Sequence, residues 1–253
     1  MKRKKVTKIN IQWELLYGLQ PVFKALRNRK RRFSELYIKK GKNNSGIIRE
    51  IHELSEELGL TLNEVPENKL TVMCPGAVHQ GVVLRCGILP FASFSDLPLT
   101  VGDDLPLIVV LDQIEDPHNL GAILRTCGFF NVSAVVISKN HSCGLTPVVS
   151  KSSSGVAEWL PVISVTNLTR FLQKQKSEGY WIVGLAEESE NFFGQLVRDR
   201  PLILVFGNEG RGIRPLIRKQ CDWIVSITGN PEVSSLNVSS AAAIALNHFY
   251  VLS

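Results

Sequence analysis

The sequence predicts an α/β fold with two domains, a small α/β domain followed by a domain built on a parallel sheet. Short apolar, β-branched runs alternate with helical patterns along the chain. In residues 105–253 these runs are apolar enough to be strands buried on both faces. Residues 89–104 are rich in Pro, Gly, Ser and Asp and show no sustained period, which indicates a linker between the domains.

Residues 14–88 are expected to form the small domain, after a basic N-terminal extension at residues 1–13. The segment from Glu14 to Ala25 has a helical pattern, and ELYIKKG (residues 35–41) alternates like a short strand. A second helix is predicted from Ser45 to Leu58, ended by Gly59. Three further short runs, apolar and β-branched, are predicted strands: residues 61–65, 68–74 and 80–86.

The second domain is predicted from repeated apolar runs separated by helical patterns. The predicted parallel strands are residues 106–112, 133–138, 181–186, 202–207 and 222–228. The predicted helices are residues 119–130, 167–178 and 236–252. This alternation favours a sheet with helices on both faces.

Composition excludes several classes of protein. With 253 residues and 44% hydrophobic content, the chain can bury a sizeable core. It has no apolar run of the roughly 18–20 residues that a membrane span needs and no secretory signal, so we expect a soluble intracellular protein without a membrane partner. The 5 cysteines are odd in number and scattered, which suggests neither disulfides nor a zinc site.

The formal net charge of +6 is distributed unevenly. Residues 1–50 contain 15 Lys and Arg against 3 Asp and Glu, a net charge of +12, and the remaining 203 residues carry 14 against 20, a net charge of −6. A basic front on an acidic body favours a polyanionic partner, because Lys and Arg gain affinity for phosphates by releasing condensed counterions. Nucleic acid is the expected partner, although charge runs are more often solvated surface.

A loop and a helix follow the first strand of the second domain, in LDQIEDPHNLGAILRTCGFF (residues 111–130). Ligands of open parallel sheets bind at the carboxyl ends of the strands, where this loop is expected. The helix carries an apolar i, i+3, i+4, i+7 stripe, formed by Leu120, Ile123, Leu124 and Cys127. Arg125 falls on the opposite side and is either functional or an ordinary surface arginine.

Two later stretches have a similar position after predicted strands. FGNEGRGI (residues 206–213) carries three glycines that permit close approach to a ligand, although such a pattern is more often a plain turn. EVSSLNVSSAAAIAL (residues 232–246) leads into the last helix, and its Ser235 or Asn237 would ordinarily be a helix cap. Phosphate-loop, serine hydrolase and metalloprotease motifs do not occur, and the 5 histidines are isolated.

In this order and spacing, DPHNLGAILR, LVFGNEGRGI and VSSLNVSSAAAI resemble the three motifs of the TrmH/SpoU branch of the SPOUT RNA methyltransferases. The resemblance spans residues 106–250. The front domain also resembles that family's small RNA-binding domain, through LYGLQPVFKAL and HQGVVL. SCGLTPVVSKSSSG (residues 142–155) is similar to the members that methylate large-subunit rRNA in mitochondria and bacteria.

The resemblance implies a C-terminal trefoil knot in the SPOUT domain, S-adenosylmethionine as cofactor and a homodimer packed through the knotted region. It implies transfer of a methyl group to the ribose 2′-hydroxyl of a guanosine in the peptidyl-transferase region of large-subunit rRNA, without a metal. The implied active-site residues are Arg125, Asn119, Glu209, Ser235 and Asn237. The implied cofactor contacts are Gly207, Ile227 and Leu236.

The basic segment, defined as Arg27, Arg29, Lys30, Arg31 and Arg32, is expected to bind RNA phosphates. MKRKKVTKIN is basic and acid-poor like a mitochondrial import segment, so we expect the protein in the mitochondrial matrix. The segment is also short and lacks Arg/Ser richness, so the cytoplasm is the alternative. The rival functions are the same reaction on tRNA, and a non-catalytic RNA-binding factor of ribosome assembly.

Overall fold

The fold is described from a computed structural model, which describes residues 12–42, 46–97, 105–187, 189, 191, 196, 199–230, 232 and 235–251. Its contacts divide the chain into two units, Met1–Leu89 and Pro90–Ser253. Residues 1–11 of the expected basic extension (residues 1–13) lie outside the described residues, and so do residues 98–104 of the expected linker. Each unit is described by itself.

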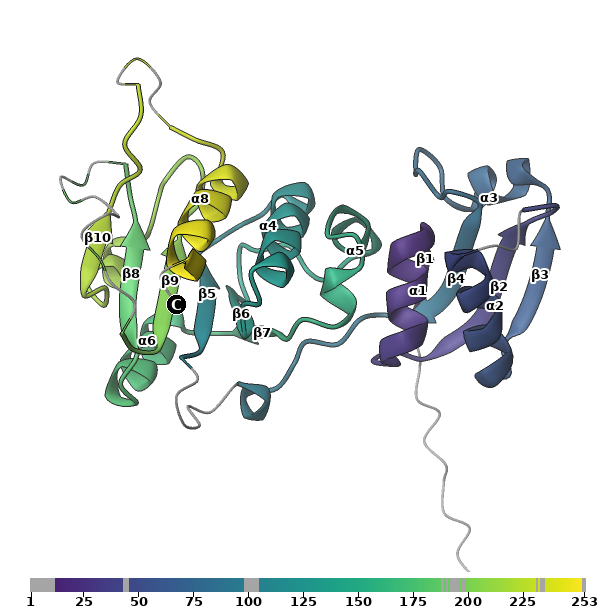
Figure 1. The fold of residues 1–253 in the computed structure, drawn as a ribbon, viewed down its shortest axis with the longest axis horizontal. Coiled ribbons are helices and arrows are strands. Elements are labelled where there is room, and N and C mark those ends of the chain that lie inside the picture. The colour runs from purple at the N-terminus through teal and green to yellow at the C-terminus, as the bar shows by residue number, and fades with distance from the viewer. Residues whose placement is uncertain are drawn as a thin grey trace, which may run out of the picture. The chain divides into compact units, whose positions relative to one another are not determined.

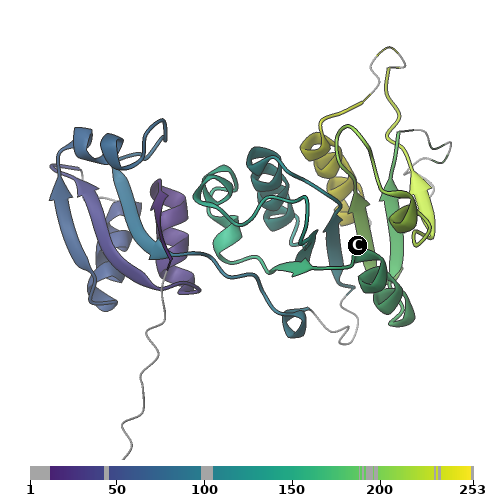
Figure 2. The same cartoon turned by 180° about the vertical axis from the view of Figure 1, so that it is seen from behind.

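The small domain is built on a four-stranded mixed sheet with strand order β1-β4-β2-β3. Its strands are β1 (Trp13–Tyr17), β2 (Phe33–Lys39), β3 (Thr61–Val65) and β4 (Val82–Gly87). Its helices are α1 (Leu19–Asn28), α2 (Ile47–Glu57) and α3 (Glu67–Met73). β4 pairs antiparallel with both β1 and β2, and β2 pairs parallel with β3. Figures 1 and 2 show this domain from opposite sides.

Both faces of this sheet are used, because side chains alternate along each strand. Leu16, Leu36 and Leu84 are buried on one face, in the core that α1 and α2 cover. On the other face, Val83 packs with Leu70 of α3 in a smaller cluster. The small domain therefore holds its own core.

Two predictions for this domain are wrong. The expected helix from Glu14 to Ala25 is strand β1 followed by α1, because Gly18 between them has φ 98° and ψ 152°, which no helix accommodates. The expected strand at residues 68–74 is helix α3, which begins directly after Pro66 and buries Leu70 against the sheet. The other predicted elements of this domain are confirmed by β2, α2, β3 and β4.

The second domain contains a six-stranded sheet in which every neighbouring pair is parallel, with strand order β10-β8-β9-β5-β6-β7. The strands are β5 (Leu107–Leu111), β6 (Ala134–Ser138), β7 (Val162–Val165), β8 (Trp181–Leu185), β9 (Leu202–Phe206) and β10 (Trp223–Val225). The five strands predicted for this domain are confirmed. β7 was not predicted, since its four residues (VISV) form too short a run to stand out.

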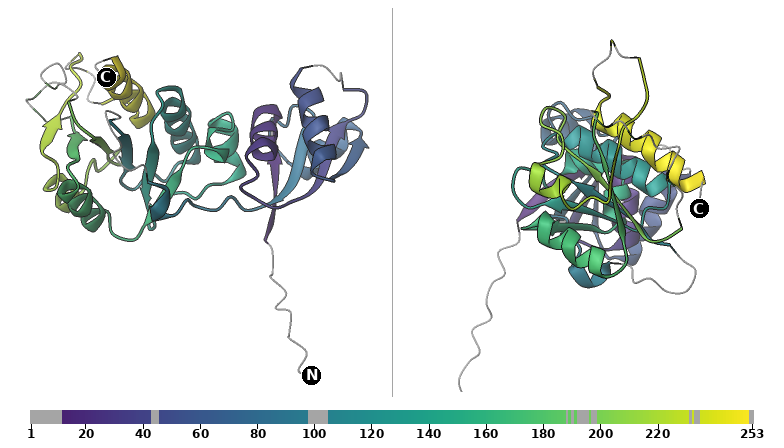
Figure 3. Two further views of the ribbon diagram at one scale, coloured as in Figure 1. Left: turned by 60° about the horizontal axis from the view of Figure 1, so that its bottom comes forward. Right: turned by 90° about the vertical axis from the view of Figure 1, so that its left-hand side faces the viewer.

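Helices cover both faces of this sheet, as Figure 3 shows from two directions. The helices are α4 (Pro117–Phe129), α5 (Pro147–Ser152), α6 (Leu168–Ser177), α7 (Pro215–Arg218) and α8 (Val238–Val251). Ile108 and Val110 face the core shared with α6 and α7. α4 packs against α8, and the predicted apolar stripe of α4 is fully buried.

The first part of the expected linker packs against the second domain. Ala92 forms a bridge with Ile163 of β7, and Phe94 contacts the ring of Phe171 on α6 with centroids 5.5 Å apart. The predicted α/β architecture with a parallel sheet is confirmed. The trefoil knot implied by the resemblance stays a prediction.

Candidate active site

Three segments that begin at the carboxyl edge of the parallel sheet carry the predicted site residues, and Asn119 and Arg125 among these residues lie on α4. One follows β5 and leads into α4, one follows β9, and one connects β10 to α8. β5 and β9 are neighbours in the sheet, so their following loops begin side by side. This edge is where open parallel sheets bind ligands.

The three segments meet in a hydrogen-bonded cluster of Asn119, in the first turn of α4, with Glu209 and Asn237. The Nδ2 atoms of Asn119 and Asn237 both donate to Oε1 of Glu209, at 2.8 and 2.6 Å. Asn237 Nδ2 also donates to Oδ1 of Asn119, at 3.0 Å. Three residues, of which Asn119 and Asn237 are 118 positions apart in sequence, thus form one polar group, and each comes from a different motif.

The amide of Asn237 is oriented by the helix that follows it. Its Oδ1 accepts from the backbone N–H of Ser239 at 2.9 Å and from the Ser239 hydroxyl at 2.6 Å, so its Nδ2 points to Glu209. Asn237 is therefore a helix cap and a member of the cluster at once. Glu209 and Asn237 are exposed and Asn119 is half-buried, so the cluster is open to a substrate.

The structure does not join Arg125 or Ser235 to this cluster by a hydrogen bond or ion pair between described residues. Arg125 is exposed on α4, as predicted, and its position is six residues after Asn119, about 120° away around the helix axis. Ser235 is exposed two residues before Asn237. Among the described residues, no hydrogen bond or ion pair joins either side chain to Glu209, so their predicted roles stay predictions.

The predicted cofactor contacts combine backbone with apolar surface. A Cβ on Gly207 would come within 2.1 Å of the carbonyl carbon of Gly212, so only glycine permits this close approach of the chain to itself. Leu236 is 45% exposed, and Ile227 is half-buried directly after Ser226. Ser226 is held by Ser189, whose carbonyl accepts from its hydroxyl at 2.8 Å.

These residues fit a nucleoside carrying a short aliphatic side chain better than a phosphorylated cofactor. Exposed apolar side chains beside main-chain groups suit an adenine and a short aliphatic chain. In the part of the chain that the structure describes, no group of three or more His, Cys, Asp or Glu side chains could hold a metal ion. In the same residues, no helix has the length and apolar character to cross a membrane.

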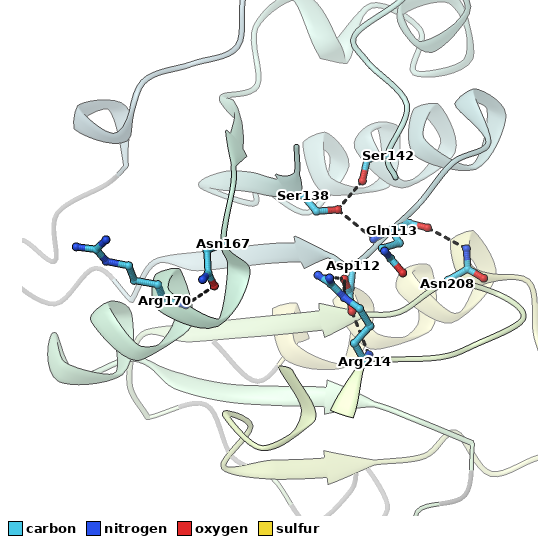
Figure 4. A network of polar contacts seen from close by, with 8 residues as sticks. All are labelled: Asp112, Gln113, Ser138, Ser142, Asn167, Arg170, Asn208 and Arg214. Atoms are coloured by element: carbon cyan, nitrogen blue, oxygen red, sulfur yellow. Dashed lines mark hydrogen bonds and ion pairs between the residues drawn. The ribbon is translucent and has the colours of Figure 1, made fainter. Parts of the chain in front are cut away.

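Sequence reasoning missed a polar network beside the cluster, drawn in Figure 4. Asp112, buried at the end of β5, accepts from the backbone and side chain of Arg214. Asn208 Nδ2 donates to the carbonyl of Gln113 at 2.9 Å. Asp112 was included in a predicted strand, and its partner is 102 residues away, so the only sequence signal was a charged residue ending an apolar run.

The structure corrects one member of the basic segment. Arg31 is 6% exposed, and its Nη1 contacts Glu14 Oε1 at 2.5 Å and donates to the carbonyl of Gly87 at 3.2 Å. A guanidinium inside the small domain cannot bind RNA phosphates, so the prediction for Arg31 is wrong. The other four members, Arg27, Arg29, Lys30 and Arg32, are exposed.

Comparison with known proteins gives the family. Residues 106–247 match the model of the SpoU rRNA Methylase family. This range contains Asn119, Glu209 and Asn237. The chain belongs to this family. Residues 15–92 match the model for RNA 2′-O ribose methyltransferase substrate binding. The resemblance carried by the three motifs is thereby confirmed for the second domain, and the resemblance carried by LYGLQPVFKAL and HQGVVL is confirmed for the small domain of this SpoU family member.

Relatives and solved structures extend this result to nearly the whole chain. The 23S rRNA (guanosine-2′-O-)-methyltransferase RlmB of Escherichia coli (strain K12) is 39% identical over 236 residues, covering 92% of this chain and 96% of its own. The SpoU methyltransferase AviRb from Streptomyces viridochromogenes, solved with the cofactor AdoMet, has a TM-score of 0.78 at 22% identity, covering 94% of this chain and 89% of its own.

A third comparison covers a smaller share of the chain. The TrmH/SpoU tRNA modifying enzyme of A. aeolicus is 28% identical with a TM-score of 0.54, and it covers 59% of this chain and 76% of its own. The fold of this chain is therefore shared over a larger share of its length with AviRb than with this tRNA enzyme.

Proposed function

We propose that this SpoU family member transfers a methyl group from S-adenosylmethionine to the ribose 2′-hydroxyl of a guanosine in large-subunit rRNA. The observation that carries the proposal is the cluster of Asn119, Glu209 and Asn237, in which three separate motifs meet at the carboxyl edge of the sheet. The relative RlmB, named for guanosine-2′-O-methylation of 23S rRNA, supports the choice of nucleoside and RNA.

The residues that would hold the cofactor are Gly207, Ile227 and Leu236. Bound there, S-adenosylmethionine supplies an electrophilic methyl group on a sulfonium. The main chain at Gly207 and the exposed side chain of Leu236 provide close approach and apolar cover. Asn237, which adjoins Leu236, places the polar cluster next to this surface.

The role of the protein is to align the 2′-hydroxyl and to stabilise the charge that develops on its oxygen. Glu209 is oriented through Oε1 by two amide groups, and its carboxylate is the candidate proton acceptor for the hydroxyl. A guanidinium offers only hydrogen-bond donors, so Arg125 acts by polarising the hydroxyl or by binding the adjacent phosphate. Ser235 is a further candidate for orienting the nucleophile.

The proposal includes a homodimer formed through α4 and α8. Three large apolar side chains on these helices are exposed: Phe129 at 80%, Tyr250 at 49% and Ile244 at 43%. The rings of Phe130 and Tyr250 are 5.5 Å apart, so this apolar surface spans both helices. Covering such a surface with a second copy would remove it from water.

The finer parts of the proposal are the peptidyl-transferase region as target and the mitochondrial matrix as compartment. Similarity of residues 142–155 to large-subunit rRNA methyltransferases supports the first, and the basic N-terminal sequence supports the second. tRNA is the alternative substrate. The assembled polar cluster disfavours a purely non-catalytic role.

A methyl transfer assay tests this function. The purified protein is incubated with methyl-labelled S-adenosylmethionine and one of three RNAs: large-subunit rRNA transcript, tRNA, or rRNA with a 2′-deoxyguanosine at the mapped site. We expect label on one guanosine ribose of the rRNA and none on the deoxy control. Label on tRNA alone would replace rRNA by tRNA as the substrate, and cofactor binding without transfer to any of these RNAs would overturn the proposal.

A further inference from the structure

The loop that carries Glu209 is a tight turn. The backbone groups of Asn208 and Gly212 pair in both directions, with N–O distances of 3.2 and 2.8 Å. The side chain of Asn208 closes the turn from inside, since its Oδ1 accepts from the N–H of Gly210 at 3.0 Å. Glu209 lies at the tip, so its position depends on how the two ends of this turn are fixed.

Both ends of the turn are tied to the residues that follow β5. At the start, Asn208 Nδ2 donates to the carbonyl of Gln113. At the end, Arg214 donates from its backbone N–H to Asp112 Oδ2 at 3.0 Å, and from Nε and Nη2 to Oδ1 at 2.8 and 2.7 Å. Figure 4 shows both attachments.

Asp112 is fully buried, whereas the side chain of Arg214 is 45% exposed. A buried carboxylate needs its hydrogen bonds, and here three of them come from a single residue of the loop. Asp112 and Gln113 also begin the segment that leads to Asn119, one of the two partners of Glu209. The turn that carries Glu209 is therefore joined to this segment at its base as well as through the hydrogen bond from Asn119 to Glu209.

We propose that Arg214 is a positioning residue, which holds buried Asp112 and thereby sets the loop geometry that brings Glu209 to Asn119 and Asn237. An apolar pair of similar volume would stabilise this site equally well, since buried ion pairs rarely add net stability. The benefit of the pair is a defined loop geometry. The inference rests on the proposed function only for the catalytic consequence, and the geometric part is independent of it.

The test compares Arg214→Met with the double variant Asp112→Leu/Arg214→Met. Arg214→Met leaves the Asp112 carboxylate buried without its partner, so its melting temperature falls. The double variant removes the carboxylate too and recovers much of the melting temperature. We expect kcat to be reduced roughly 10- to 100-fold in both variants, with KM for RNA changed less than about threefold, because a loop displaced by about 1 Å misplaces Glu209. Arg214→Lys should recover part of kcat.

Arg200→Met is the matched control. Arg200 pairs with Asp199 at the opposite, amino-terminal end of β9, and both side chains are exposed. Its guanidinium also lies over the ring of Trp181, 3.9 Å from the ring centroid, so its loss should lower the melting temperature slightly and leave kcat unchanged. Equal loss of kcat in this control would mean that arginine removal anywhere near β9 disturbs the enzyme, and it would overturn the assignment to Arg214.

Hydrogen–deuterium exchange of the peptide covering residues 207–214 gives a readout independent of activity. Both Arg214 variants should exchange faster in this peptide while β5 stays protected. Full recovery of kcat in the double variant, or unchanged hydrogen–deuterium exchange of residues 207–214, would overturn the positioning role. The pair of Asp112 and Arg214 would then contribute only to stability. If the wild-type protein transfers no methyl group to any RNA, the proposed function fails, and the exchange result still decides the positioning role.

Discussion

Among the described residues, both domains contain a pair of a carboxylate and an arginine in which the side chain of one partner is completely buried, and these two pairs are arranged in opposite ways. In the small domain the arginine is inside: the side chain of Arg31 is 0% exposed and that of Glu14 is 18% exposed. In the methylase domain the carboxylate is inside: Asp112 is 0% exposed and Arg214 is 45% exposed.

The difference separates a scaffold contact from a site contact. Arg31 is enclosed by strand residues, including Glu14 of β1 and the carbonyl of Gly87 in β4, so it joins two strands of the sheet. Asp112 accepts from a loop that carries a proposed catalytic residue. Removing the first contact should disturb folding, and removing the second should disturb chemistry.

The largest expected effect is on the small domain. Arg31→Met leaves Glu14 without its buried partner and should lower the free energy of unfolding of that domain by about 3–5 kcal/mol. Calorimetry of the whole chain measures this as a shift of one transition, with S-adenosylmethionine binding kept. Arg29→Met is the control, because Arg29 pairs with Glu57 on the surface, where such pairs contribute about 1 kcal/mol or less. Equal shifts in the two variants would contradict the scaffold role.

The second expected effect concerns an arginine that the described contacts join to no carboxylate. Arg125→Ala should reduce kcat by about 100- to 1,000-fold, as removal of a group that stabilises developing charge does. Cofactor affinity, measured by isothermal titration calorimetry, and the melting temperature should stay unchanged because Arg125 is exposed on α4. Loss of cofactor binding would contradict the role of Arg125 at the 2′-hydroxyl and would assign it to the cofactor.

A smaller effect is expected from the exposed members of the basic segment. The double variant Arg27→Gln/Arg32→Gln should raise the apparent KM for RNA. It should also reduce the slope of log affinity against log salt by about 0.7–0.9 for each RNA phosphate that the variant no longer neutralises. Arg49→Gln/Lys69→Gln removes the same charge from exposed positions on α2 and α3 of this domain. Equal changes in both double variants would show a general charge effect without a defined RNA-binding surface.

Sequence patterns predicted the parts of the fold that depend on periodicity or on ordered motifs. The stripe of Leu120, Ile123, Leu124 and Cys127 predicted which side of α4 is buried, since helical spacing places these residues together. The three motifs predicted that Asn119, Glu209 and Asn237 belong to one site. Their hydrogen bonds confirm that they meet, although their catalytic roles stay predictions.

The misses share a physical cause, because each depends on a contact or a backbone angle that no local pattern records. The conformation of Gly18 divides an apparently helical segment into β1 and α1. Charge alone placed Arg31 with its exposed neighbours, while pairing with Glu14 buries it. The pair of Asp112 and Arg214 forms only when β5 and β9 align, which the order of residues does not reveal.

The smallest expected effect depends on whether burial or the attraction of Arg31 dominates the pKa of the Glu14 carboxyl. Burial raises the pKa of the Glu14 carboxyl above its ordinary value of 4.5, and the attraction and hydrogen bond of Arg31 oppose this without reversing it. The folded domain therefore binds the Glu14 proton more tightly than the unfolded chain does, so this contribution to stability is present below a pH of about 4.5 and is lost as pH rises through the folded pKa.

Glu14→Gln imitates the protonated carboxyl at every pH, so it isolates this contribution. The stability of the wild-type small domain, relative to Glu14→Gln, should fall as the pH is raised from about 4 to about 7, a span that covers the ordinary carboxyl pKa. Urea unfolding at several pH values measures the difference, with Glu64→Gln, an exposed carboxyl of β3, as control for net charge. A relative gain in wild-type stability with rising pH would mean that Arg31 outweighs burial at Glu14, so that the pair of Glu14 and Arg31 stabilises the ionised carboxylate.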